Sequence, residues 1–279
     1  MDNERKSALG NLMMALLKAG CYLLLFLGCQ LLVSVAVTAI VTLLTMVDGS
    51  ISYELAMEQA LSKSALISLL SSLLTLAALV IFFLARKKNI LREVGLAKTD
   101  LSQVGAAAAI TPALYLLVSL VLALFPQSML DDYNAVSAPL GDANVTLFLA
   151  TVLAAPLVEE AIFRGLIQSR LERAMPAWLS GLVAALLFGL CHGQILWIIY
   201  AFLLGFLFSR MRMTSRSILP SLAAHFVFNL IGFLMVALEP VLSPEAMSGA
   251  ILAFSVAGLI ITRRQLPRLF GFGRGRNPD

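Results

Sequence analysis

The sequence predicts an all-α, polytopic membrane protein, and three observations lead to this class. Of its 279 residues, 60% are hydrophobic and only 13% are charged, and the mean hydropathy is +0.93. These values leave too few polar groups to coat a soluble globule. Apolar stretches of about 20 residues recur along the chain, which is the length that crosses a hydrocarbon core of about 30 Å. The basic residues, finally, fall on one side of the membrane.

We expect eight membrane spans, all helical, because an open strand in lipid leaves its backbone polar groups without partners. The predicted spans are residues 19–47, 64–85, 104–125, 146–163, 177–194, 195–209, 217–238 and 246–262. The first is too long for a signal peptide and is interpreted as a retained anchor. The fifth ends in a very short turn, so we expect it to be displaced toward the cytoplasm or to stop short.

The distribution of basic residues supports this topology. With the N-terminus in the cytoplasm, eight crossings place every one of the 20 Lys and Arg residues on the cytoplasmic side except Lys63. This asymmetry is what the positive-inside rule predicts. We therefore expect a multi-pass protein of the cell membrane with both termini in the cytoplasm. The net charge of +4 is explained by these loops, so a nucleic-acid partner is excluded and the lipid bilayer is the expected one.

The chain is expected to divide into three regions, with a catalytic core in the C-terminal five helices. Residues 1–144 form a three-helix membrane region and an outer loop, 145–232 the core, and 233–279 the last helix and a basic tail. The outer part of the first region, 126–145, is interpreted as a lid or connector. The tail is interpreted as a solvated segment that touches anionic lipid.

A few ionisable or amide side chains lie inside the predicted spans, where a charge costs several kcal/mol unless it is paired or wetted. Those singled out as functional candidates are Glu159, Glu160, His192, His225 and Asn229, with Arg164 one turn after the glutamates. His192 and His225 are the chain's only histidines. We expect these residues to build one polar site, the alternative being a structural polar clamp between helices.

Helical spacing assigns different roles to the two adjacent carboxylates. Glu160 and Arg164 are four residues apart and can pair on one helix face. Glu159 lies about 100° around the helix from Glu160, so it stays available for chemistry. The same spacing places His225 beside Asn229. It also allows Phe188 to pack beneath His192, although a core aromatic is an equally good interpretation.

This cluster suits hydrolysis of a peptide bond. Glu159 is the natural general base for a water molecule, a neighbouring imidazole can position that water, and a second histidine with an Asn amide can donate to an oxyanion. Zinc bound by Glu159, His192 and His225 is the competing interpretation. Because the helical HExxH pattern of zinc proteases is absent, a site without a cofactor is favoured and zinc remains the alternative.

Other intramembrane proteases fit less well. A two-aspartate protease needs Asp inside spans, and every Asp here lies in a loop or tail. A serine protease is disfavoured because no nucleophile elbow accompanies either histidine. Cys191 and His192 are adjacent on a helix and do not face each other, so Cys191 is interpreted as a core thiol.

Three motifs resemble those of the CPBP family of intramembrane proteases, which includes CAAX prenyl endopeptidases and bacteriocin-processing (Abi) proteins. They are Glu159-Glu160-Ala-Ile-Phe-Arg164, Phe188-Gly-Leu-Cys-His192 and His225-Phe-Val-Phe-Asn229, which match EExxxR, FxxxH and HxxxN. The resemblance covers about residues 145–232. It implies that Glu159 and His192 activate the water, that Glu160 and Arg164 support the helix, and that His225 and Asn229 form the oxyanion site. Family members are often labelled metalloproteases.

The resulting hypothesis is an intramembrane endopeptidase that cleaves a membrane-associated peptide or lipidated, CAAX-like protein near the cytoplasmic leaflet. One alternative is a non-catalytic membrane protein that serves bacteriocin immunity or binds a peptide in the same pocket. A second alternative is an ion-coupled transporter with a buried carboxylate. The absence of paired half-helices broken by Gly or Pro argues against that alternative.

Overall fold

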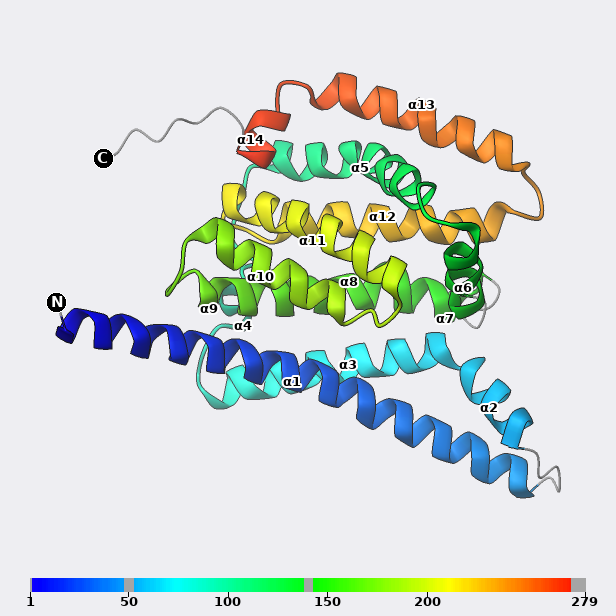
Figure 1. Ribbon diagram of the computed structural model, residues 1–279, viewed down its shortest axis with the longest axis horizontal. Helices are drawn as coiled ribbons and strands as arrows, with labels where there is room; N and C mark the ends of the chain where they lie inside the picture. Colours follow the sequence, from blue (N-terminus) through cyan, green and yellow to red (C-terminus); the bar gives the residue numbers. More distant parts are fainter. Residues whose placement is uncertain (1, 48–52, 138–142, 272–279) are drawn as a thin grey trace.

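The computed structural model describes residues 2–47, 53–137 and 143–271, and every regular element in these ranges is a helix (Figure 1). The long helices are α1 (Asp2–Val47), α3 (Ser64–Ala85), α5 (Leu101–Leu122), α10 (Ala177–Leu190), α11 (Ile195–Ser215), α12 (Leu219–Leu238) and α13 (Pro244–Thr262). The short ones are α2 (Tyr53–Leu61), α4 (Ile90–Glu93), α6 (Gln127–Ser137) and α14 (Leu266–Phe270). The predicted class, an all-helical multi-pass membrane protein, is confirmed.

The fourth predicted span is one helical rod in which the hydrogen-bond register changes. It consists of α7 (Val145–Leu147), the π-helix η2 (Phe148–Ala154), α8 (Ala155–Glu159), the π-helix η3 (Glu160–Gln168) and α9 (Ser169–Leu171). The rod continues past the predicted end at residue 163, because Arg164 and Gln168 are fully buried in protein and therefore need no water. Turns of π-helix are rare and often accompany functional sites.

The predicted span boundaries are correct to within a few residues for most helices. Seven helical stretches in the described ranges are long and apolar enough to cross a membrane. The eighth, α10, is apolar but only 14 residues long, or about 21 Å. The predicted fifth span, 177–194, thus ends early, at Leu190. This agrees with the second of the two expectations for it, that it stops short. A count of eight full spans is not confirmed.

Two other boundaries needed correction. Helix α1 begins at Asp2 rather than at residue 19. The polar residues before the predicted span continue the same helix outside the bundle. The 46 residues of α1 measure about 69 Å. Helix α11 continues from the predicted end at 209 to Ser215. In the loop predicted at 126–145, α6 forms a helix, whereas residues 138–142 lie outside the described residues, as does the tail from residue 272.

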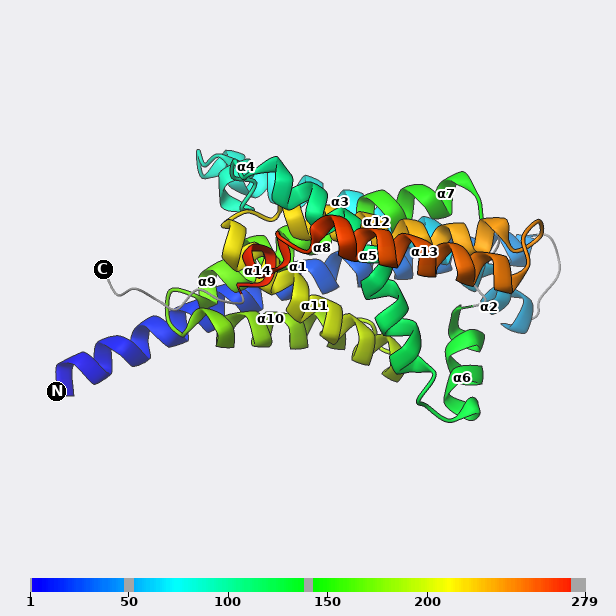
Figure 2. The ribbon, with the colours of Figure 1, turned by 90° about the horizontal axis from the view of Figure 1, so that it is seen from above.

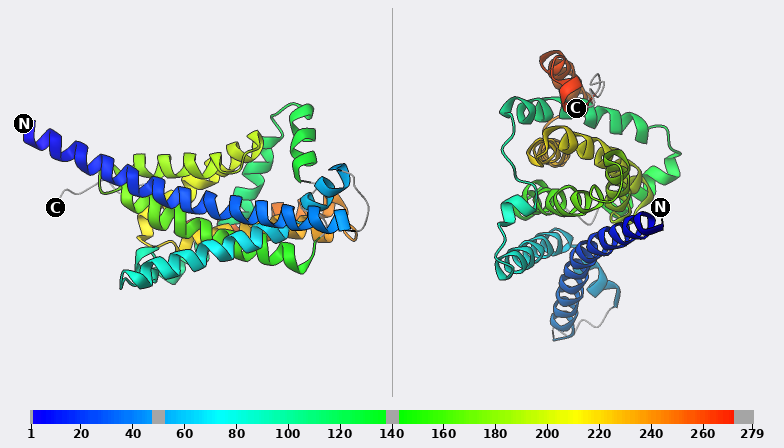
Figure 3. Two further views of the ribbon diagram at one scale, coloured as in Figure 1. Left: turned by 90° about the horizontal axis from the view of Figure 1, so that it is seen from below. Right: turned by 90° about the vertical axis from the view of Figure 1, so that its left-hand side faces the viewer.

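The helices form layers, with the rod of residues 145–171 in the middle. Figure 1 and the right panel of Figure 3 show α1 and α3 on one side of the rod, and α12, α5 and α13 on the other. Helices α10 and α11 form a hairpin beside the rod. Helix α5 contains Pro112, and Figure 2 shows that it bends along its length, as proline in a helix interior requires. The start of α1, α4, α9 and α14 lie at one end of the bundle, and α2 and α6 at the other.

The hydrophobic interior has two parts that meet at the middle layer. One cluster includes Phe163 and Phe188, and the other includes Phe208 and Phe228. Tyr200 of α11 packs against both clusters. The polar side chains of the next section lie at this junction.

A short crossing segment holds the rod at one end of the bundle. A Cβ on Gly165 would lie 2.3 Å from the Val94 carbonyl oxygen, so only glycine lets the chain after α4 cross η3. The same segment accepts a hydrogen bond at Gly95 O from Ile218 N, at 3.0 Å. The rod and the start of α12 are therefore held against one another beside residues 94 and 95.

Candidate active site

A fully buried ion pair lies at the centre of the site. Arg164 Nη1 is 2.9 Å from Glu160 Oε1, and both side chains are 0% exposed. The predicted pairing of these two residues is confirmed. A buried carboxylate and guanidinium that neutralise each other avoid the cost of a lone charge in the membrane interior.

Two aromatic rings enclose the guanidinium. Arg164 Cζ lies 4.3 Å from the centroid of the Phe188 ring and 5.4 Å from that of Phe208. The nitrogens of Arg164 have no hydrogen-bond partner of good geometry among the described residues, so the ion pair and the ring faces stabilise the cation. Gly205 makes room for this arrangement, because a Cβ there would lie 3.0 Å from Phe188 Cδ1 and 3.1 Å from Arg164 Nη2.

His225 joins the two adjacent glutamates. Its Nδ1 lies 3.0 Å from Glu160 Oε1, and its Nε2 lies 3.5 Å from Glu159 Oε2. Because a carboxylate paired with arginine can only accept, Nδ1 carries the proton of the first contact. That leaves Nε2 as the nitrogen that faces Glu159, and their contact is attractive only when one of the two atoms carries a proton. The Glu159 side chain is 16% exposed, unlike that of Glu160.

His192 contacts the site through Phe188. Its Nδ1 lies 2.9 Å from the Phe188 carbonyl oxygen, and its ring meets the Phe188 ring edge-on at 4.9 Å between centroids. The predicted packing of these two residues is confirmed. Phe188 also meets the His225 ring at 5.9 Å, so one phenyl ring contacts both imidazoles. No hydrogen bond or ion pair between His192 and Glu159 is recorded in the part of the chain that the structure describes.

Asn229 is held by a carbonyl that the π-helix leaves available. Asn229 Nδ2 donates to Thr151 O at 2.7 Å. In η2 the pairing runs from residue i to i+5, as the bond from Ala155 N to Ala150 O shows. The corresponding donor for Thr151 O would be residue 156, which is proline and has no N–H. The amide side chain of Asn229 takes that place, and its second N–H stays available.

The structure therefore brings most of the predicted residues together, in a pattern that the sequence did not specify. Glu159, Glu160, Arg164 and His225 share direct contacts. The imidazole at Glu159 is that of His225, whereas the motif-based prediction pairs Glu159 with His192. Whether His192 positions the water stays a prediction.

Three contributors were not predicted. Phe208 stacks on the His225 ring, with centroids 5.1 Å apart, and Gly205 and Thr151 shape the surroundings as described above. Phe208 and Gly205 are three residues apart and so lie on one face of α11, a weak signal among many apolar residues. Pro156 was the better signal, because a proline inside a helix always leaves a carbonyl without its donor.

The donor groups do not fit a metal site in this arrangement. The predicted alternative ligand set is Glu159, His192 and His225. Among the described residues, no group of three or more His, Cys, Asp or Glu side chains is placed to hold a metal ion.

Comparison with known proteins supports the resemblance carried by the three motifs. Residues 141–231 match the family model described as type II CAAX prenyl endopeptidase Rce1-like. This range contains all three motifs, so the predicted likeness to CPBP intramembrane proteases is confirmed over it. No curated protein and no solved structure matches the chain.

Proposed function

We propose that this chain, similar over residues 141–231 to CAAX prenyl endopeptidases, is an intramembrane endopeptidase that uses Glu159 to activate water. The observation that carries the proposal is the difference between two adjacent carboxylates. Glu160 is fully buried and paired with Arg164, whereas Glu159 is partly exposed and faces an imidazole nitrogen. The first is structural, and the second can exchange a proton with water.

In the proposed reaction, Glu159 takes a proton from a water molecule as the water oxygen attacks the substrate carbonyl carbon. The carbonyl oxygen becomes an oxyanion, and the proton on Glu159 then passes to the leaving amine as the peptide bond breaks. General-base catalysis of this kind contributes about 10²- to 10⁴-fold. We keep His192 as the candidate for positioning the water, because its ring is held by Phe188 at the edge of the same cluster.

His225 and Asn229 are the proposed oxyanion donors. Asn229 uses one N–H on Thr151 O and has a second for the substrate. His225 is fixed by its Nδ1 contact with Glu160. Because Nδ1 already carries a proton, His225 donates to the oxyanion in its imidazolium form, with a second proton on Nε2. Donors fixed before the reaction stabilise the oxyanion without reorganisation.

The proposed substrate is a membrane-associated peptide or a lipidated, CAAX-like protein, because the site lies among membrane helices and the matched family acts on prenylated proteins. The test uses the purified full chain in liposomes with quenched fluorescent peptides, in matched forms with and without a C-terminal isoprenoid. We expect cleavage of the isoprenylated form and at least 100-fold slower cleavage by Glu159→Gln. The control is Glu245→Gln, which changes an exposed carboxylate at the start of α13.

Two results would overturn parts of this proposal. Equal cleavage by the wild type and by Glu159→Gln would remove Glu159 as the base. If no peptide is cleaved and both proteins bind the isoprenylated form equally, a non-catalytic peptide-binding or immunity role would replace proteolysis.

A further inference from the structure

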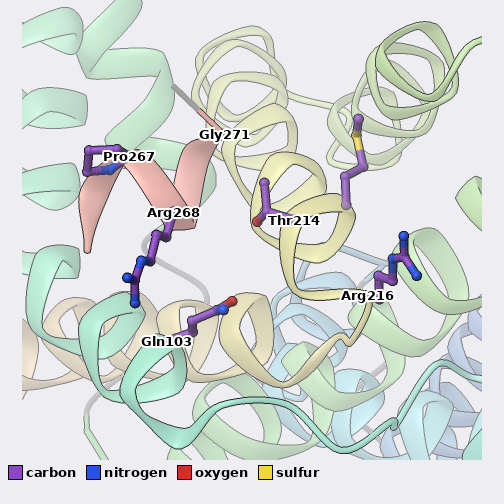
Figure 4. Close-up of a pocket in the computed structure, with 7 residues that line it drawn as sticks. Gln103, Thr214, Arg216, Pro267, Arg268 and Gly271 are labelled. Atoms are coloured by element: carbon purple, nitrogen blue, oxygen red, sulfur yellow. The ribbon is translucent and has the colours of Figure 1, made fainter. Parts of the chain in front are cut away.

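A second polar feature lies away from the glutamates, at the end of the bundle that holds α4, α9 and α14. Helices α5, α11 and α14 enclose a pocket of about 210 Å³ whose lining includes Gln103, Thr214, Arg216, Arg268 and Gly271. Figure 4 shows Arg268 and Gln103 on one side of this pocket, Arg216 on the other, and Thr214 between them. We call it the arginine pocket.

The walls of the arginine pocket are fixed by hydrogen bonds between α11 and α14. Arg210 donates to Phe270 O through Nε at 3.2 Å and Nη2 at 2.6 Å, and Thr214 Oγ1 donates to Leu269 O at 2.8 Å. Leu269 and Phe270 are buried. The short helix α14 is thus held against α11, with Arg268 exposed above it.

Unlike their neighbours, the two arginines of the pocket have no hydrogen-bond or ion-pair partner among the residues that the structure describes. Arg210 is used as above, and Arg212 pairs with Glu172. No ion pair or hydrogen bond of the Arg216 or Arg268 guanidinium is recorded within the described ranges. The Asp100 carboxylate lies near Arg268, and its pKa is lowered by hydrogen bonds from Ser102 and, to a smaller extent, by the Arg268 charge. Its two oxygens, however, accept from Ser102 N at 2.9 Å and Ser102 Oγ at 2.7 Å.

The backbone at Arg216 is fixed by its neighbours. Arg216 ends α11 with φ 57° and ψ 22°, a left-handed conformation at a position where glycine is strongly preferred. The next residues hold it there, because Ser217 Oγ donates to Ala97 O at 2.8 Å and Ile218 N donates to Gly95 O. The backbone that carries Arg216 is therefore held in place.

The position of the pocket near the helix ends indicates that it lies at the level of the membrane surface. Its residues lie within a few positions of the ends of three apolar helices, Leu101–Leu122, Ile195–Ser215 and Pro244–Thr262. Lipid phosphates lie at this level, and basic pockets between membrane helices bind lipid headgroups there.

From these observations we infer that the arginine pocket binds the phosphate of an anionic phospholipid. Arg216 and Arg268 donate to the phosphate oxygens, as guanidinium groups commonly do. This site is separate from the proposed active site and does not depend on the proposed proteolysis.

The test measures lipid retention by the purified, delipidated full chain with native mass spectrometry. The probes are phosphatidylglycerol, which is anionic, and phosphatidylcholine, whose headgroup carries no net charge. We expect one phosphatidylglycerol to bind in preference to phosphatidylcholine. The double variant Arg216→Gln with Arg268→Gln should bind it at least tenfold more weakly, because a hydrogen bond to a charged group is worth enough for such a factor.

The matched control is Arg263→Gln with Arg264→Gln, which removes the same charge from exposed arginines at the end of α13. This control should bind phosphatidylglycerol as the wild type does. An equal loss in both double variants would mean diffuse attraction to the basic surface and would overturn the proposal. Equal retention of the two lipids would overturn it as well.

A second variant separates binding from folding. Arg216→Gly suits the left-handed backbone, so without lipid its thermal unfolding temperature should equal or exceed that of the wild type while its lipid affinity falls. Inorganic phosphate is tested in parallel for thermal stabilisation of the wild type. If phosphate alone stabilises the wild type as much as phosphatidylglycerol does, the ligand is a free phosphate and the lipid assignment fails.

Discussion

Glu159 and Glu160 are adjacent in the chain but have different surroundings. Glu160 is fully buried between Arg164 and His225, and Glu159 is partly exposed. The difference arises because consecutive helical residues point about 100° apart. It predicts that substitutions at Glu160 act mainly on stability and substitutions at Glu159 mainly on catalysis.

The buried pair should be strongly coupled in a double-mutant cycle. Arg164→Met leaves the Glu160 carboxylate buried without its cation, and we expect a loss of about 3–5 kcal/mol. The double variant Arg164→Met with Glu160→Gln should lose less than Arg164→Met alone, because no lone charge remains. Thermal unfolding in one detergent measures all four proteins. Strictly additive losses would contradict the coupling.

Gly205 provides a second prediction at the residue scale. Gly205→Ala brings a Cβ to 3.0 Å from Phe188 Cδ1, which should displace Phe188 and Arg164 at a cost of about 1–3 kcal/mol. Gly232→Ala on α12 is the control, since no atom lies within 4 Å of a Cβ there and alanine favours a helix by up to about 1 kcal/mol. Unfolding temperatures that change equally in the two variants would show that Gly205 does not shape the site.

Spacing along one helix predicted the local pairs but not the partners on other helices. The Glu160–Arg164 pair and the Phe188–His192 contact follow from four-residue spacing. The contact of His225 with both glutamates depends on how α12 packs against the rod, and no spacing within one helix determines that. The same holds for the Asn229 bond to Thr151, which also requires the π-helical register.

At the scale of elements, α4 and α9 are tied together by Glu93. Arg170 Nη2 lies 2.5 Å from Glu93 Oε2, and Lys88 Nζ lies 3.2 Å from Glu93 Oε1. Partial burial alone would raise the pKa of Glu93, but the hydrogen bonds and charges of Lys88 and Arg170 outweigh it, so the pKa is lowered. This contact lies beside the segment that crosses the rod at Gly165.

This lowered pKa predicts a pH dependence. A carboxyl group whose folded-state pKa lies below its unfolded value adds stability above the unfolded pKa, and loses it as the pH falls through the folded pKa. At neutral pH, Glu93→Gln should therefore be less stable than the wild type by about 1 kcal/mol and should unfold at a lower temperature. In acid, the two proteins should unfold at the same temperature. Unfolding scans across pH check this, with the exposed Asp132→Asn on α6 as control. A constant difference at every pH would contradict it.

Element boundaries were predicted well where lipid alone decides them and less well where protein does. The span 64–85 agrees with α3 at both ends. The rod and α11 extend beyond their predicted ends because Arg164 and Gln168 in the rod and Arg210 and Arg212 on α11 are partnered or enclosed by protein. Hydropathy treats such residues as the end of a span. Hydropathy also does not distinguish either π-helical segment from an α-helix.

At the scale of the whole molecule, the short α10 leaves the number of crossings to be measured. If the α10–α11 hairpin crosses twice, both termini lie on one side, as the distribution of Lys and Arg predicts. Reporters that are active only in the cytoplasm, fused to either end, should then both be active. Activity at one end alone would mean an odd number of crossings. A reporter at Asp132 on α6 supplies the opposite-side control.

The overall class of the molecule could be predicted from composition, since a chain with this hydropathy has no other solvent than lipid. The site could be predicted as a set of residues from three motifs. Its internal arrangement and the arginine pocket could not, because both arise where helices distant in sequence meet. Arg216 and Arg268, for example, are 52 positions apart and line the same pocket.

The central claim is that Glu159 performs peptide hydrolysis in the membrane. Its most direct test compares peptide termini in membranes from cells that lack the native protein and carry the wild type, Glu159→Gln or Glu245→Gln at equal abundance. We predict new termini with the wild type and with Glu245→Gln, and none with Glu159→Gln, which would also identify the substrate. Identical termini in all three membranes, with Glu159→Gln restoring any defect of the deletion, would contradict the claim.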